Sequence, residues 1–242
     1  MTDAALILVA AGKSVRLGSD LPKPYLPLAG EPMLVQSLRT LCGLDSLRRA
    51  VVVAAADRLA DAAGIIAERG PWRAPVEIVA GGAERQDSVA NGLAAVTEPY
   101  VMIHDAARPF ISLDTAAACL QAAIRSGAAI VAVPAHDTVK LAGVDGSIER
   151  TVDRSRIWLA QTPQTFRTEL LRQALARARA RGEILTDDAA LMEAAGHPVE
   201  LVPGDPDNRK ITTAADYHWA QWFARAREVQ SPSFPRRGQG GG

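Results

Sequence analysis

The sequence predicts an α/β fold with a doubly wound, mostly parallel β-sheet and one projecting β-hairpin arm. Short apolar runs of strand length alternate with segments of helical periodicity, a pattern typical of a parallel sheet covered by helices on both faces. Between residues 137 and 158 the alternation stops, and two β-prone segments flank a Gly-Val-Asp-Gly turn. We expect one domain over residues 1–230, followed by a disordered tail or linker over residues 231–242, which are rich in Pro, Gly and Ser.

Apolar runs predict strands at 6–10, 50–54, 76–79, 100–104, 128–133 and 199–202. A helix begins near Met33, and a second, capped by Asp57, runs to about Arg69. Further helices are predicted over 87–96, over 113–126 behind a Ser112 or Asp114 cap, over 167–181, from 186 to about 195, and from a capping box at 213–216 to about 229. No helix or strand is predicted for residues 159–166.

The first predicted strand leads into a loop with two glycines and two separated cations, Arg16 and Lys23. Glycines let backbone N–H groups approach phosphate oxygens, and the cations supply charge, so the loop is suited to a polyphosphate. Two commoner motifs are excluded. Ile7 stands where a P-loop requires glycine, and Ser14 and Leu17 stand where a dinucleotide-binding fingerprint requires it. An ordinary loop with solvated charges is the alternative.

Composition narrows the function classes. The chain has 242 residues, 48% hydrophobic and 22% charged, with a formal net charge of zero. This balance does not indicate a general nucleic-acid or membrane surface, so any anion binding must come from local clusters. Only two cysteines occur, Cys42 and Cys119, which we interpret as reduced thiols in a cytoplasmic protein. No apolar run reaches transmembrane length, and the acidic N-terminus is unlike a signal peptide.

Ligands of a doubly wound sheet bind at the carboxyl ends of its strands. The loops after the first, third and fourth predicted strands should therefore converge on one site. These loops carry Arg16 and Lys23, Gly82 and Arg85, and Asp105 and Arg108.

Several motifs occur in a fixed order: A-A-G-K-S-V-R at 10–16, P-K at 22–23, G-G-A-E-R-Q-D-S-V at 81–89, H-D-A-A-R-P at 104–109, D-T-V-K at 137–140, T-V-D-R at 151–154, Q-T-P-Q at 161–164, T-D-D-A at 186–189 and D-N-R-K-I-T at 207–212. Together they resemble the 2-C-methyl-D-erythritol 4-phosphate cytidylyltransferase family over about residues 4 to 225. The resemblance implies a Rossmann-like sheet of the nucleotide-diphospho-sugar transferase type. The family usually has glycine at the place of Ser14 and glutamine at the place of Pro24.

The resemblance implies transfer of CMP from CTP to 2-C-methyl-D-erythritol 4-phosphate, with release of pyrophosphate, in isoprenoid precursor synthesis. It implies four catalytic cations: Arg16, Lys23, Arg154 and Lys210. It implies a nucleotide site made by Ala10, Ala11, Gly12, Gly81, Gly82, Ser88 and Asp105. Asp105 would also bind Mg²⁺, the one expected cofactor. The acceptor site would contain Asp105, Arg108, Thr138, Arg154, Thr162 and Lys210.

An isolated two-stranded arm is marginally stable in water, so we expect a second subunit to cover it and form a homodimer. A hairpin that lies on its own domain is the alternative. Arg154 lies beyond the arm and is expected to reach the neighbouring subunit's site. Two other functions stay open: a cytidylyltransferase for another polyol phosphate, such as ribitol phosphate, and a nucleotide-binding module without catalysis.

Overall fold

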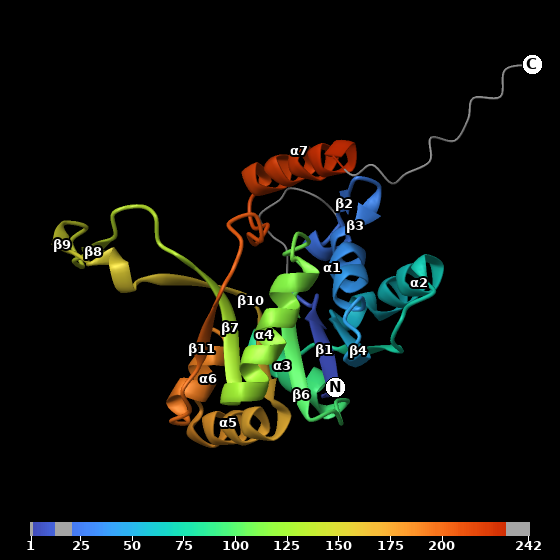
Figure 1. Ribbon diagram of the computed structural model, residues 1–242, viewed down its shortest axis with the longest axis horizontal. Helices are drawn as coiled ribbons and strands as arrows, with labels where there is room; N and C mark the ends of the chain where they lie inside the picture. Colours follow the sequence, from blue (N-terminus) through green and yellow to red (C-terminus); the bar gives the residue numbers. More distant parts are fainter. Residues whose placement is uncertain (1, 13–20, 231–242) are drawn as a thin grey trace, which may run out of the picture.

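The computed structural model describes residues 2–12 and 21–230, and its centre is a seven-stranded sheet (Figure 1). The order across the sheet is β11 (Glu200–Pro203), β7 (Ala128–Pro134), β10 (Trp158–Arg167), β6 (Tyr100–Asp105), β1 (Ala4–Val9), β4 (Leu47–Ala54) and β5 (Val76–Ala80). All pairings are parallel except those of β10 with β6 and β7. The predicted α/β class and mostly parallel sheet are confirmed.

Helices cover both faces of this sheet, and the alternation of side chains along β1 shows why. Leu6 and Leu8 pack with α1 (Met33–Leu41), α2 (Leu59–Arg69) and α4 (Leu113–Ser126). Ala5 and Ile7 point to the opposite face, toward α3 (Arg85–Ala94), α5 (Thr168–Arg181) and α6 (Asp188–Ala194). A strand buried on both faces is a continuous apolar run rather than an alternating one. That is why the apolar runs located the parallel strands from sequence.

The antiparallel strand β10 is the main element that the apolar pattern did not predict. It lies between β6 and β7, inside the sheet, although its sequence contains Gln161, Thr162, Pro163 and Gln164. Pro163 has no N–H to donate, and the register with β7 shifts between Ala160 and Gln164. A proline among polar residues argues against a central strand, and here the polar side chains are instead satisfied by buried hydrogen bonds.

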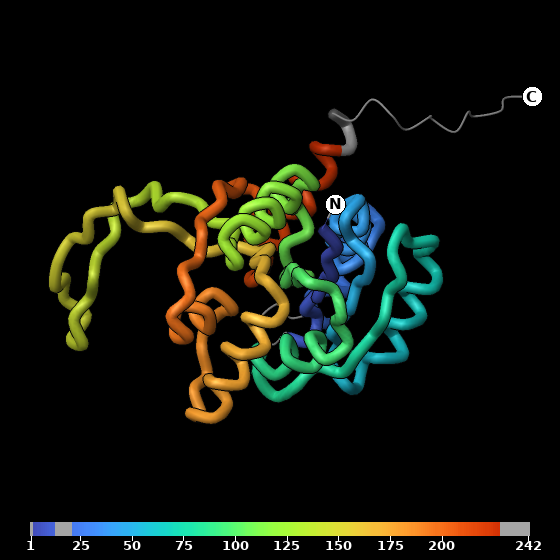
Figure 2. Tube along the Cα trace, turned by 60° about the horizontal axis from the view of Figure 1, so that its bottom comes forward, coloured from blue at the N-terminus to red at the C-terminus, as the bar shows by residue number. Residues whose placement is uncertain are grey.

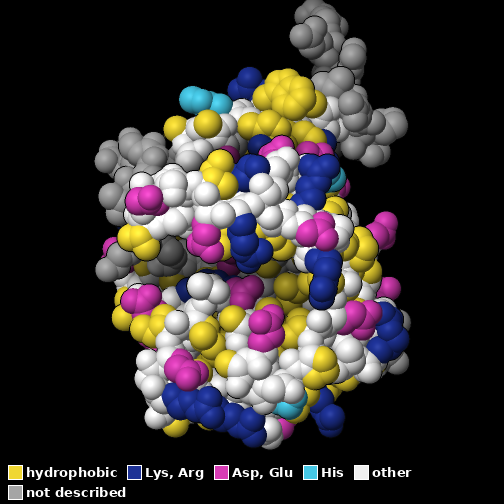
Figure 3. All heavy atoms as spheres, turned by 90° about the vertical axis from the view of Figure 1, so that its left-hand side faces the viewer, with side chains coloured by type: hydrophobic (Ala, Val, Ile, Leu, Met, Phe, Trp, Pro, Cys, Tyr) yellow, Lys and Arg dark blue, Asp and Glu magenta, His cyan; other side chains and the backbone are white. Residues whose placement is uncertain are grey.

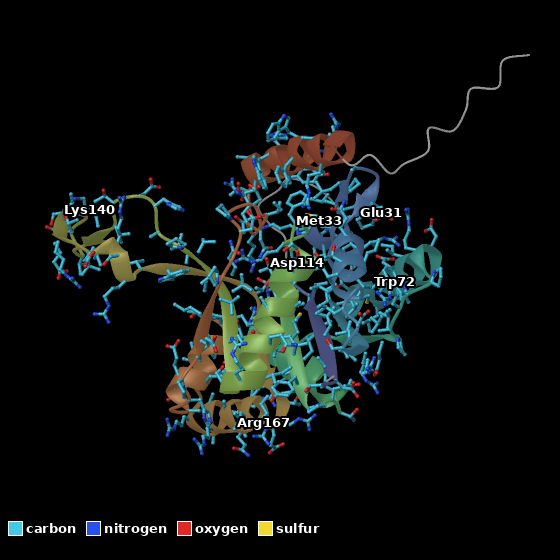
Figure 4. The ribbon with its side chains drawn as sticks, viewed as in Figure 1. Glu31, Met33, Trp72, Asp114, Lys140 and Arg167 are labelled. Atoms are coloured by element: carbon cyan, nitrogen blue, oxygen red, sulfur yellow. The ribbon has the colours of Figure 1, made fainter. Side chains whose placement is uncertain are left out.

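The projecting arm is confirmed. β8 (Lys140–Ala142) and β9 (Ile148–Thr151) form their own antiparallel pair, and every residue of both strands is exposed. Figures 1 and 2 show the arm extending away from the sheet, and Figure 4 shows Lys140 on it, apart from Met33 and Asp114 of the main body.

Of the predicted helix caps, Ser112 is confirmed, because its hydroxyl accepts from the Thr115 N–H. The prediction for Asp57 was wrong: it lies within the 3₁₀ turn η2 (Ala56–Arg58), and α2 follows with no side-chain cap. The 3₁₀ turn moves the start of the α-helix beyond the reach of that carboxylate.

The last helix, α7 (Ala214–Gln230), packs against the short hairpin formed by β2 (Pro27–Leu28) and β3 (Glu31–Pro32). Its predicted capping box is present, since Asp216 accepts from Thr213 N–H and the Thr213 hydroxyl accepts from Asp216 N–H. Among the described residues no helix is both long and apolar enough for a bilayer span. The predicted tail over 231–242 lies outside the described residues.

Candidate active site

A cavity of about 380 Å³ lies at the carboxyl edge of the sheet, where β1, β5 and β6 end. This is the edge at which the sequence predicted the convergence of loops. Residues from five separate stretches of the chain line it. Those predicted from sequence are Ala11, Gly12, Lys23, Gly82, Ser88, Asp105 and Lys210.

The charged centre of the cavity is the Asp105 carboxylate, which lies between two cations. Lys210 Nζ is 2.8 Å from its Oδ2, and Arg85 Nε is 3.4 Å from its Oδ1. Burial alone would raise the pKa of Asp105, but Arg85 and Lys210 outweigh burial and hold it well below its usual range. Asp105 is therefore an anion at neutral pH and fixes the ammonium of Lys210 on the cavity wall.

Arg85 is bonded to a second carboxylate. Its Nη2 donates to Asp188 Oδ2 at 2.8 Å, and Asp188 is buried behind the cavity wall. Burial opposes the charge of Arg85, but the carboxylates of Asp188 and Asp105 outweigh that effect and raise its pKa. Burial raises the pKa of Asp188, and the charge and hydrogen bond of Arg85 oppose that rise. Paired with the guanidinium at 2.8 Å, Asp188 forms an ion pair with Arg85. The four side chains Lys210, Asp105, Arg85 and Asp188, which we call the ion cluster, thus contain two positive and two negative charges.

The loop that carries Lys210 is fixed by hydrogen bonds to its neighbours. Arg108 Nη1 donates to the Asn208 carbonyl at 2.9 Å, and the Ile211 N–H donates to the Ala107 carbonyl at 2.8 Å. Lys23, on the 3₁₀ turn η1 (Lys23–Tyr25), donates to the Thr212 carbonyl at 2.7 Å. These contacts bring Lys23 and Lys210 together although they lie far apart in the sequence.

The floor of the site is a buried network below Asp105. The Asp105 N–H donates to Thr162 Oγ1 at 3.1 Å. The Thr162 hydroxyl in turn donates its proton to His104 Nδ1 at 3.0 Å. His104 Nε2 then donates to the Arg108 carbonyl at 3.0 Å. Every donor finds an acceptor when His104 is the neutral Nε2–H tautomer. Burial lowers the pKa of His104 to about 4, which agrees with a neutral ring.

Replacing Thr162 by valine should lower the free energy of unfolding by about 1–3 kcal/mol, because the His104 ring and the Asp105 N–H each lose a buried partner. Urea denaturation measures this. The same substitution at Thr151, on the exposed arm, is the control and should change stability by less than about 0.5 kcal/mol. Equal losses at the two positions would show that the buried network contributes nothing.

His104 should also make stability depend on pH. Its folded-state pKa of about 4 lies below its unfolded value, so the unfolded chain binds the proton first as pH falls. The stabilisation is complete above about pH 6.5 and lost toward pH 4, about 3 kcal/mol in all. Urea denaturation gives the free energy of unfolding at pH 7 and at pH 4.5. The difference between these two values should be smaller for His104→Gln than for the wild type or for the exposed His218→Gln. An unchanged difference in His104→Gln would contradict this.

The nucleotide-binding residues predicted around Gly81 and Gly82 lie where backbones approach closely. A Cβ atom added at Gly81 would lie 2.4 Å from Ala11 Cβ and 2.9 Å from Ser88 Oγ. One added at Gly82 would lie 2.3 Å from Asp87 Cβ. Ala10 and Gly81 are not part of the cavity wall but bond across the strands beneath it, to the carbonyls of Val53 and Ala54. Only glycine fits at positions 81 and 82, where Ala11 packs against the 81–88 loop. Gly82 lines the cavity and Gly81 supports it from beneath, and we call this pair the glycine wall.

Not every predicted site residue faces the cavity. Arg16 lies outside the described residues. Thr162 is buried and uses its hydroxyl within the floor network, and Arg108 ties two loops together. Thr138 and Arg154 are exposed at the base of the arm, where the Arg154 guanidinium donates to the His136 carbonyl. The substrate contacts of these residues stay predictions.

Asp105 is the predicted Mg²⁺ ligand, and the donor set around it is small. Over residues 2–12 and 21–230, no three His, Cys, Asp or Glu side chains gather in a way that could hold a metal. Mg²⁺ commonly takes one or two carboxylates and completes its shell with phosphate oxygens and water. A single carboxylate therefore fits a Mg²⁺ ion that arrives with a triphosphate, and does not fit a cation held by protein alone.

Comparison with known proteins decides the family. The model of the family described as IspD, 2-C-methyl-D-erythritol 4-phosphate cytidylyltransferase, matches residues 4–226. The chain belongs to this family of nucleotidyltransferases. A 2-C-methyl-D-erythritol 4-phosphate cytidylyltransferase of Pelotomaculum thermopropionicum is 41% identical over 230 residues, which cover 94% of this chain and 97% of that protein.

Two further similarities bear on architecture. A crystal structure of 2-C-methyl-D-erythritol 4-phosphate cytidylyltransferase from Thermus thermophilus superposes with a TM-score of 0.76 at 36% identity, covering 93% of this chain and 100% of that one. A bifunctional enzyme IspD/IspF of Anaeromyxobacter dehalogenans is 46% identical over 91% of this chain, but the match spans 56% of that longer protein.

Two residues of the ion cluster were not predicted as site residues. Arg85 was recognised only as part of a converging loop, although a cation beside Gly81 and Gly82 is a usable signal. Asp188 belongs to the T-D-D-A motif at 186–189, but no role was assigned to it, because an aspartate in the first turn of a helix is already explained by the helix dipole.

Proposed function

We propose that this enzyme transfers CMP from CTP to 2-C-methyl-D-erythritol 4-phosphate and releases pyrophosphate. The observation that carries this proposal is the cavity in which Lys23 and Lys210 lie beside a glycine wall, in a chain of this family. A pocket of this kind suits a nucleoside triphosphate, because the cations face its phosphates and the close backbone approach at Gly81 and Gly82 limits the space for the base.

The reaction requires no protein nucleophile. A phosphate oxygen of the acceptor forms a bond to the α-phosphorus of CTP, and the bond from that phosphorus to the β-phosphate oxygen breaks, so that pyrophosphate leaves with the electron pair. Two anions must approach each other, so positioning and charge stabilisation supply the catalysis. Lys23 and Lys210 would stabilise the charge on the transferring and leaving phosphates, and Arg16 is proposed to act with them.

We propose Mg²⁺ as the cofactor, with Asp105 as its one protein carboxylate; when bound, it would neutralise phosphate charge. Asp105 would meanwhile keep Lys210 directed into the cavity. The acceptor is proposed to bind on the side of Lys210, with Arg108 and Thr162 shaping that side from beneath.

We propose a homodimer that covers the arm. Apolar side chains along the arm and the strand that returns from it are exposed, among them Leu141, Ile148, Trp158 and Leu159. A second subunit would bury them and would allow Arg154 and Thr138 to reach a site. Analytical ultracentrifugation tests this. The wild type should sediment as a dimer, and Ile148→Lys should contain a larger fraction of monomer than the wild type. A monomeric wild type would contradict it.

A pyrophosphate-release assay tests the function. It compares CTP, UTP, ATP and GTP with methylerythritol phosphate, with and without Mg²⁺, and repeats the CTP reaction with ribitol phosphate. We expect release only with CTP, the methylerythritol acceptor and Mg²⁺. Faster turnover of ribitol phosphate would favour the other polyol phosphate. CTP binding without release for any acceptor would favour a nucleotide-binding module.

The proposed reactants are small molecules, and the proposed reaction needs neither a nucleic acid nor a membrane. Figure 3 shows Lys and Arg side chains intermixed with Asp and Glu on the face toward the arm. The cytoplasmic location and the absence of nucleic-acid and membrane partners stay predictions.

A further inference from the structure

Asp188 stands out because it is a carboxylate buried without full compensation. Its side chain is 1% exposed, and within the part of the chain that the structure describes, Oδ1 has no hydrogen-bond partner. Its Oδ2 accepts from Arg85 Nη2 at 2.8 Å. A buried carboxylate is costly unless it is paired, and an apolar residue of similar size would usually serve packing better. A charge retained at this position calls for a functional reason.

The charges of the ion cluster give that reason. Arg85 lies between Asp188 and Asp105, and Asp105 lies between Arg85 and Lys210, at distances of 2.8, 3.4 and 2.8 Å along the series. Without a negative charge on Asp188, Asp105 would be the one carboxylate of the described residues that still pairs with Arg85. Arg85 would then compete with Lys210 for that carboxylate, and the Lys210 ammonium would lose its fixed place.

The backbone around Asp188 is held in place independently of its carboxylate. Gln164 Oε1, on β10, accepts from the N–H groups of Asp188 and Ala189 at 3.1 and 3.0 Å. Asp187 caps the helix through the Ala190 N–H and accepts from Gln164 Nε2. The first turn of α6 is therefore anchored by Gln164 and Asp187. The Asp188 side chain is left to set the position of Arg85.

We propose that Asp188 is a positioning residue for this reaction: it holds Arg85, so that Asp105 keeps the Lys210 ammonium directed at the phosphates. The proposal rests on the proposed function, because Lys210 acts there on a phosphorylated reactant. Asp188 touches no reactant itself, since it lies behind the wall and does not line the cavity. Arg85 pairs with the carboxylates of both Asp188 and Asp105 and so links them.

Asp188→Asn should lower kcat by about 10²-fold, the scale of a misplaced reacting group. The KM for CTP should change far less, because the glycine wall and Lys23 are untouched. Asp187→Asn is the matched control: it removes the same charge from the same helical turn, keeps a good N-cap residue and does not touch Arg85. Equal losses of kcat in the two variants would overturn the proposal.

A double-mutant cycle separates positioning from a structural role. If Asp188 acts through Arg85, then Arg85→Met/Asp188→Asn should have the same kcat as Arg85→Met, within about twofold. A structural contribution of Asp188 to α6 would persist in the Arg85→Met background, and a full additional loss there would overturn the proposal.

Two further measurements keep the test decisive. If Asp188→Asn does not fold, Arg85→Lys is measured in its place, because one ammonium cannot bridge both carboxylates. A wild-type kcat in folded Arg85→Lys would overturn the proposal.

Crystal structures of the variants give a readout that does not depend on turnover. The contact between Lys210 Nζ and Asp105 Oδ2 should be lost in Asp188→Asn and kept in Asp187→Asn. An inactive wild type would count against the proposed function alone, and an unchanged contact against Asp188 alone.

Discussion

Replacing Lys210 by methionine should lower kcat by about 10²–10³-fold, the usual loss when one fixed donor to a developing charge is removed. The Lys210 ammonium is held by Asp105 at 2.8 Å, on a loop tied to two other loops, so its position costs no reorganisation during the reaction. Methionine keeps most of the length of the side chain and removes the charge. Steady-state kinetics of pyrophosphate release measure the effect.

Arg209 provides the matched control, one residue away on the same loop. Its guanidinium lies over the Trp219 ring, 4.3 Å from the ring centroid, and it does not line the cavity. Arg209→Met removes the same charge from the same loop and should keep kcat within about threefold, since an exposed charge outside the cavity is screened by solvent and salt. Comparable losses in both variants would mean that overall charge, not the placed ammonium, carries the effect.

The second large effect should come from Gly81→Ala. The added Cβ would meet Ala11 Cβ at 2.4 Å and Ser88 Oγ at 2.9 Å, so the loop after β1 or the 81–88 loop must move. We expect a loss of about 1–3 kcal/mol in the free energy of unfolding, as for overpacked sites. We also expect the KM for CTP to rise about tenfold, equivalent to ~1.4 kcal/mol of binding free energy.

Gly64→Ala is the control for this substitution. Gly64 lies inside α2, and a Cβ there would meet no atom within 4 Å. Alanine should stabilise the protein by about 0.5–1 kcal/mol, because it reduces the conformational entropy of the unfolded chain, and kinetics should not change. If Gly81→Ala bound CTP as the wild type does, the glycine wall would not form the nucleotide site.

The elements predicted well from the sequence are those whose own residues decide them. Strands β1, β4, β6 and β7 are apolar runs because both sheet faces are covered, and α4 carries its cap at Ser112. β10 was not predicted, because its polar residues become acceptable only through long-range contacts. Gln164 bonds to α6, and Thr162 to His104. A local pattern contains no information about such partners.

In the candidate site, too, some features follow from the sequence and others depend on long-range contacts. The loops carrying Lys23, Gly82 and Asp105 were predicted to converge, because topology brings strand ends to one edge, and the cavity contains all three. The family motif placed Lys210 with them. It gave no indication that Asp105 is bonded to two cations, or that Asp188 completes the ion cluster. Those facts depend on how α3, α6 and the 204–212 loop pack, and the order of motifs does not encode them.

The central claim is that this cavity joins two phosphorylated reactants at the α-phosphorus of CTP. The most direct measurement incubates CTP labelled with ³²P at the α-phosphate with 2-C-methyl-D-erythritol 4-phosphate and enzyme, then separates the products. We predict that the label appears in a cytidine diphospho-alcohol while the pyrophosphate stays unlabelled, and that Lys210→Met slows this transfer. Label that remains in CTP, or that appears as free CMP or inorganic phosphate, would contradict the account.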